Sequence, residues 1–177
     1  MTANISEKDK HIYMVMGITL HQLHAFENLF KFVMTFIIQR DSPLNIDKYE
    51  RLEKEYSKKT LGYFLKELRL RAVVSDEYAD LLEELLEKRN IFIHCPGTIQ
   101  GWDLFSNEGQ KIAEAFMARL ASIAGTLNLL HSGFIYDWSK ETGIPCGNIP
   151  DPAMEELIKT NYSGKINLLL RAKPLGQ

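Results

Sequence analysis

The sequence is short of cysteine and of long apolar runs, and both shortages exclude classes of protein. It has two cysteines, Cys95 and Cys146, which are too few for a disulfide-built scaffold. The two could pair, but the N-terminus shows no secretory signal pattern, so a reducing compartment is the expectation. The most hydrophobic stretch, residues 12–38, is interrupted by polar side chains and lacks a run of about 18 apolar residues. We therefore expect a cytoplasmic protein with no membrane partner.

An excess of charge of one sign is lacking as well. The formal net charge is −2, so the molecule as a whole does not attract nucleic acid or anionic lipid. Any contact with RNA has to come from a local basic site. What the sequence does have is 177 residues, of which 45% are hydrophobic and 25% charged. These values are ordinary for one soluble globular domain with a packed core.

Helical periodicity dominates the sequence. Apolar residues recur at spacings of three and four, and no alternating strand pattern of useful length occurs. Thr60 and Ser75 precede helical patterns as N-caps, and Asn107 with Gln110 resembles a capping box. The expected helices cover about residues 10–40, 47–59, 60–71, 75–94 and 107–130.

These helices predict an all-α fold, an antiparallel helical bundle of four to five helices over residues 1–133. Ser132 and Gly133 are expected to loosen the last helix. Residues 134–177 are interrupted by glycine and proline. They are expected to form a short irregular C-terminal extension that packs on the bundle or on a partner subunit.

The helix over 75–94 carries a charged residue on its apolar face. The inner stripe consists of Tyr78, Leu81, Leu82, Leu85 and Leu86, and its next position is Arg89. A guanidinium is rarely buried without a partner. Either Arg89 meets a buried carboxylate, or the stripe opens into a cleft where the charge meets a ligand. Asn90 and His94 are four residues apart, so they share one face of the last turn.

The residues from Arg89 to His94, Arg-Asn-Ile-Phe-Ile-His, resemble the motif of HEPN domains, in which an Arg and a polar residue are followed by a His. Glu87 and Lys88 precede the motif at the end of a helix near the middle of the chain. Upstream, residues 59–65 resemble the Thr-Leu-Gly turn often found before the HEPN motif helix. The resemblance covers about residues 12–130.

The resemblance implies a metal-independent endoribonuclease without a cofactor, which cuts RNA by attack of a ribose 2′-hydroxyl on the adjacent phosphate. His94 would transfer protons, Arg89 would hold the scissile phosphate, and Asn90 would orient either His94 or the phosphate. Small stand-alone members of the family are commonest as prokaryotic toxins or phage-defence effectors. The partners implied are RNA, a second copy of the chain, and an antitoxin or regulatory protein.

One position departs from a subgroup of the family. That subgroup has a Tyr two places after the His, where a partner enzyme modifies it, and this chain has Pro96 there. Regulation by that route is therefore not expected. The alternative to the nuclease is a non-catalytic HEPN domain that acts as a protein-interaction or nucleotide-binding module. A plain structural salt bridge of Arg89 also remains open.

Other residues are weaker candidates. Basic residues with a possible role in RNA binding are Lys66, Arg69, Arg71 and Lys88, and Trp102 could stack on a base or pack in the core. His21, His24 and Glu27 follow one another at intervals of three residues. Because this spacing moves the side chains progressively around the helix, no metal site is predicted.

The first helix predicts a homodimer. Apolar residues between 12 and 38 lie on nearly all sides of this helix. One small bundle cannot bury that many sides of a helix. A second copy of the chain is the simplest cover, and a two-fold axis would let the two motif helices face each other.

Overall fold

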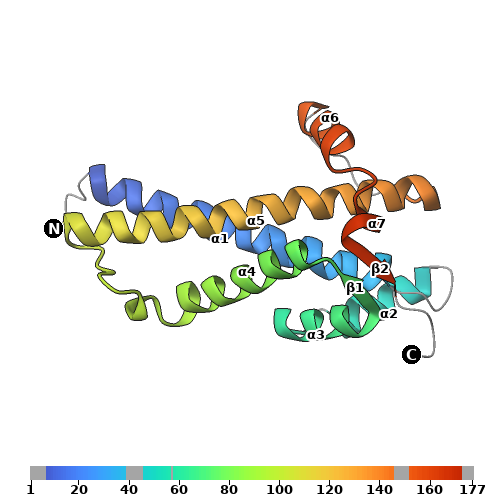
Figure 1. The fold of residues 1–177 in the computed structure, drawn as a ribbon, viewed down its shortest axis with the longest axis horizontal. Helices are drawn as coiled ribbons and strands as arrows, with labels where there is room; N and C mark the ends of the chain where they lie inside the picture. The colour runs from blue at the N-terminus through green and yellow to red at the C-terminus, as the bar shows by residue number, and fades with distance from the viewer. Residues whose placement is uncertain (1–6, 39–45, 57, 146–151, 173–177) are drawn as a thin grey trace.

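The computed structural model describes residues 7–38, 46–56, 58–145 and 152–172. The all-α fold is confirmed, because helices make up most of these ranges (Figure 1). The helices are α1 (Glu7–Phe32), α2 (Ile46–Tyr56), α3 (Leu61–Arg71), α4 (Asp76–His94), α5 (Asn107–Thr142), α6 (Pro152–Asn161) and α7 (Ile166–Leu169). A π-helical turn (Val33–Ile37) continues α1, and a 3-10 turn (Pro96–Thr98) follows α4. Within these ranges no helix combines the length and the apolar character that crossing a membrane requires.

The two longest helices, α1 and α5, lie side by side and run in the same direction (Figure 1). The amide of Gln110 donates to Asp9 over 3.0 Å near their first turns, and Asn128 donates to Gln22 over 3.0 Å further along. Helix α4 runs antiparallel to α5, since its first turn meets the middle of α5 and its last turn lies beside the start of α5. The predicted antiparallel packing therefore holds for α4 against α5, whereas α1 and α5 are parallel.

The core lies where α1, α3, α4 and α5 meet. Its largest fully buried side chains include Phe26, Phe30, Phe64, Tyr78 and Phe134. Aromatic rings pack against one another here, for example Phe26 on Phe30 with centroids 5.5 Å apart. Burial of such side chains is the main favourable term in folding.

The helix starts follow the predicted caps with one exception. Thr60 and Ser75 accept hydrogen bonds from the backbone three residues on, so both predicted N-caps are confirmed. The cap of α5 is Ser106, one residue before the predicted Asn107. The predicted capping box is wrong because the Gln110 side chain turns to Asp9 and to a backbone carbonyl instead.

The predicted loosening at Gly133 is wrong, because α5 continues unbroken to Thr142. Gly133 is needed for a close approach rather than for a break. A Cβ at this position would meet the carbonyl oxygen of Tyr162 at 2.6 Å. Asp137, one turn further along α5, accepts hydrogen bonds from Ser163 (2.5 Å) and from the backbone of Gly164 (2.7 Å). The chain after α6 is thus fixed across α5.

The C-terminal extension also forms a short sheet that the sequence did not predict. Strand β2 (Leu170–Ala172) pairs antiparallel with β1 (Ala72–Val74), so that Ala72 lies opposite Ala172. Ser75, which follows β1, donates its backbone N–H to the carbonyl oxygen of Leu169 over 3.0 Å. These contacts join residues 169–172 to residues 72–75 of the same chain. Cys146 lies outside the described residues.

Candidate functional site on helix α4

Helix α4 holds the predicted catalytic residues, and both of its ends have a clear cause. Ser75 accepts from the backbone N–H of Tyr78 over 3.4 Å, and Asp76 and Glu77 supply negative charge to the positive end of the helix. The helix ends at His94 because Cys95, which precedes Pro96, leaves helical geometry. The motif therefore occupies the last turns of α4, as predicted.

The Arg89 guanidinium is bound by a carboxylate from α1. Its Nη2 and Nε lie 3.0 Å and 3.1 Å from Oε1 of Glu27, and the two side chains are 25% and 21% exposed. Its Nη1 donates to the Asn90 side-chain oxygen over 3.2 Å. The sequence left open whether Arg89 meets a buried carboxylate or a ligand in a cleft. The structure shows a partly buried carboxylate. Sequence reasoning considered Glu27 only as a metal ligand and missed it as the partner of Arg89.

Asn90 and His94 lie on the outer face of α4. Both are exposed, and the spacing of four residues places them on the same side of the last turn. Within the described part of the chain no hydrogen bond joins Arg89 to His94. Asn90 is therefore the link in this arrangement, since it contacts Arg89 and shares a face with His94.

The outer face of α4 leading to the motif is acidic. Asp80, Glu83 and Glu87 are exposed and fall on the same helical face as Asn90. Lys88 lies 3.8 Å from Glu84, and its ammonium is 5.2 Å from the centre of the Phe116 ring. The motif of a single subunit thus has little uncompensated positive charge around it.

The predicted basic cluster on α3 is not brought to the motif. Arg69 forms an ion pair with Glu83, and Arg71 forms one with Glu67 and a hydrogen bond to Tyr56. Lys66 is exposed. Two of the three predicted phosphate ligands are therefore already bound to carboxylates of the same chain.

Trp102 packs against the end of α4. Its ring meets Phe92 and Phe116 edge-on, with centroids 6.5 Å and 6.1 Å apart, and it is partly buried. Phe105, three residues on, is 94% exposed. Of the aromatic rings in this loop, Phe105 is the one open to solvent, while Trp102 supports the motif helix from behind.

No metal cluster of His, Cys, Asp and Glu side chains occurs among the described residues. His21 and His24 are exposed on α1, and Glu27 is bound to Arg89.

A fully buried histidine on α5 is a second feature that sequence reasoning missed. His131 is surrounded by the rings of Phe26, Phe30 and Phe134, and its Nε2 lies 2.6 Å from the Tyr78 hydroxyl. Its Nδ1 has no partner within the described residues. Burial lowers the pKa of His131 to about 3 and raises the pKa of Tyr78. The pair is therefore uncharged at neutral pH, and it belongs to the core rather than to the motif.

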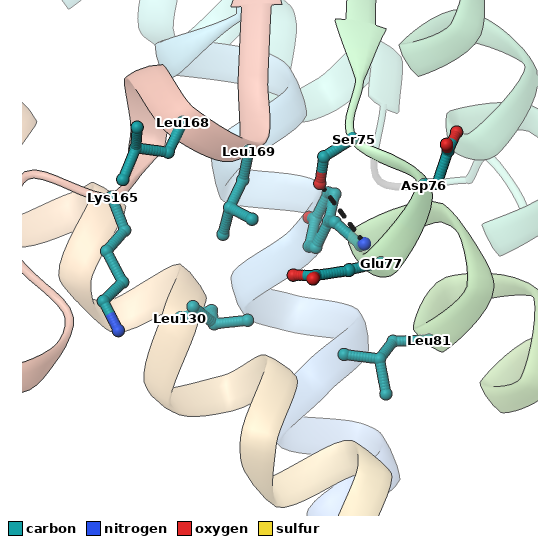
Figure 2. A pocket seen from close by; sticks show the side chains of 9 residues that line it. Ser75, Asp76, Glu77, Leu81, Leu130, Lys165, Leu168 and Leu169 are labelled. Carbon is teal, nitrogen blue, oxygen red and sulfur yellow. Dashed lines mark hydrogen bonds between the residues drawn. The ribbon is translucent and has the colours of Figure 1, made fainter.

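A pocket of about 620 Å³ lies at the other end of α4 (Figure 2). Leu81, Leu130 and Leu169 line its apolar part, with Glu77 and Lys165 at its sides. These residues come from the first turns of α4, from α5, from α7 and from Lys165 just before α7. The pocket shares no residue with the motif.

Comparison with models of protein families, with curated proteins and with solved structures finds no match for this chain.

Proposed function

We propose that this protein is an endoribonuclease of the HEPN type that cuts RNA without a metal ion. The observation that supports the proposal best is the arrangement at the end of α4. A guanidinium, an amide and an imidazole lie within two turns, with Asn90 bonded to Arg89 and His94 open to solvent. These three groups suit the binding of a phosphate and the transfer of a proton.

In the proposed reaction the ribose 2′-oxygen bonds to phosphorus while the bond from phosphorus to the 5′-oxygen breaks. His94 transfers the proton that leaves the 2′-hydroxyl or the one that reaches the 5′-oxygen. Arg89 stabilises the extra negative charge on the phosphate in the transition state. The products are a cyclic phosphate and a free 5′-hydroxyl.

A homodimer is part of the proposal. Tyr13, Met14 and Ile18 are each more than half exposed on the N-terminal half of α1, around Gly17. This patch lies at the same end of the helical body as the last turn of α4 (Figure 1). A second copy that covers the patch would bring a second motif, with its own Arg89, Asn90 and His94, near the first.

The biological role that we propose is that of a cytoplasmic prokaryotic toxin or phage-defence effector, controlled by an antitoxin or another regulatory protein. This role rests on the sequence resemblance to HEPN domains alone.

A non-catalytic HEPN module is the second candidate. It is favoured by the ion pair between Arg89 and Glu27 and by the acidic outer face of α4, because both oppose binding of an RNA backbone. Such a module would bind another protein or a nucleotide.

RNA cleavage in the presence of excess EDTA tests the proposal. We expect the wild-type protein to cut total RNA under these conditions. We expect Arg89→Ala and His94→Ala each to slow cleavage about 100-fold or more, because each removes a group that acts in the transition state. Arg51→Ala, an exposed change on α2, is the control and should cleave at the wild-type rate.

Circular dichroism and light scattering should show all variants folded and in the same oligomeric state. Loss of cleavage on removal of metal, or equal cleavage by wild type and both motif variants, would exclude this nuclease. A wild-type protein that leaves RNA intact would favour the non-catalytic module.

A further inference from the structure

The ion pair between Glu27 and Arg89 occupies one part of the guanidinium and leaves another part open. A guanidinium has five N–H donors. Nε gives one to Oε1 of Glu27, and Nη1 gives one to Asn90. Nη2 lies 3.0 Å from the same Glu27 oxygen in the ion pair. Each terminal nitrogen therefore keeps at least one N–H group outside these hydrogen bonds. Two N–H groups on neighbouring nitrogens are what bidentate binding of a phosphate requires.

The contact also joins two helices. Glu27 belongs to α1 and Arg89 to α4, and both side chains are only about a quarter exposed. An arginine side chain has many rotamers when free. Because Glu27 belongs to a different helix and the site is partly buried, the contact fixes the orientation of the guanidinium relative to α1 as well as to α4.

We propose that Glu27 is the positioning residue of Arg89. It binds the Nε side of the guanidinium and so directs the remaining terminal N–H groups toward the scissile phosphate. This role rests on the proposed nuclease function. The opposite role would be a latch, in which Glu27 competes with the phosphate and its removal increases binding and cleavage of RNA.

Three substitutions separate these roles. Glu27→Gln keeps a side-chain oxygen at the same distance and should cleave within about threefold of wild type. Glu27→Asp keeps the charge but draws the oxygen back by one methylene, and Glu27→Ala removes it. Both should lower kcat about 10- to 100-fold with little change in KM, because misplacement of a catalytic group by about 1 Å costs on this order. KM should change little because every variant keeps the Arg89 guanidinium that contacts the phosphate.

The control is Glu114→Ala, which removes another contact between helices, that of Oε1 of Glu114 with Nε2 of His11 at 3.0 Å. It should cleave as wild type does. The NMR signal of the Arg89 Nε–H gives a readout that does not depend on cleavage. It should be protected from exchange with water in wild type and in Glu27→Gln, and exposed in Glu27→Ala.

The outcomes are distinct. A folded Glu27→Ala that cleaves as fast as wild type, or faster, overturns the positioning role while the nuclease stands. Normal cleavage by Glu27→Asp together with loss in Glu27→Gln shows that only the charge matters, and this also overturns it. The comparison of Glu27→Asp with Glu27→Gln tests the positioning role even if Glu27→Ala does not fold. A wild-type protein without cleavage removes both the nuclease and this role.

Discussion

Replacing His131 with phenylalanine is expected to remove much of the acid sensitivity of the fold. The pKa of this buried imidazole is lowered to about 3, while in the unfolded chain it is near 6.5. Below pH 6.5 the unfolded chain therefore binds a proton that the folded protein does not accept. The contribution of His131 to stability is fully present above pH 6.5 and is lost as the pH falls toward 3.

The size of the effect follows from these two pKa values. Between pH 7.5 and pH 5 the free energy of unfolding should fall by about 2 kcal/mol through His131 alone. His131→Phe lacks this fall. The variant should nevertheless be less stable at pH 7.5, by about 1–3 kcal/mol, because the buried Tyr78 hydroxyl loses its hydrogen-bond partner.

Urea unfolding followed by circular dichroism at both pH values measures the effect. Tyr78→Phe is the matched control, since it breaks the same hydrogen bond but keeps the imidazole, and it should keep the pH dependence. The double variant should lose that dependence and recover part of the stability that His131→Phe lost. If His131→Phe loses as much stability on acidification as wild type, His131 is protonated in the native state and the reasoning is refuted.

Placing one 2′-deoxyribose on the 5′ side of the cut bond is expected to abolish cleavage there, because no other group replaces the nucleophile; products with a 5′-phosphate and a free 3′-hydroxyl would contradict the mechanism. Light scattering at micromolar concentration is expected to show a dimer. The variant Ile18→Asp places a charge in the exposed apolar patch, so it is expected to be a monomer with little activity. Mixed Arg89→Ala and His94→Ala subunits should regain some cleavage, whereas a fully active monomer would show that the dimer is incidental. Gly133→Ala is expected to lower the free energy of unfolding by about 1–3 kcal/mol, because the new Cβ meets a backbone oxygen at 2.6 Å. Urea melts should show no such loss for Gly125→Ala, where a Cβ meets nothing within 4 Å, and equal losses would refute the close approach.

The sequence predicted the motif helix well because local signals determine it. Ser75 caps its start, Pro96 ends it, and its apolar stripe leads to Arg89, whose need for a partner was recognised. The identity of that partner could not be predicted. Glu27 is 62 residues away, and which face of α1 meets α4 depends on how the whole bundle packs.

The features that sequence reasoning missed depend on contacts between distant segments. Gly133 indicated a weak point in α5, but its function is to let the chain after α6 cross the helix. His131 stands within an apolar stripe and gave no periodic signal of its own. The strands β1 and β2 are three residues each, which is too short to show an alternating pattern.

The parallel pairing of α1 with α5 has a consequence for how the protein is made. Asp9 and Gln110 are 101 residues apart, and Gln22 and Asn128 are 106 apart, so the main contacts of α1 close very long loops. Contacts between segments so far apart in sequence slow folding. On the ribosome α1 is complete long before α5 exists, and its apolar side chains lack their cover during that interval. A chain that ends before Asn107 should therefore aggregate or remain bound to chaperones, and the native core can form only once synthesis has passed His131.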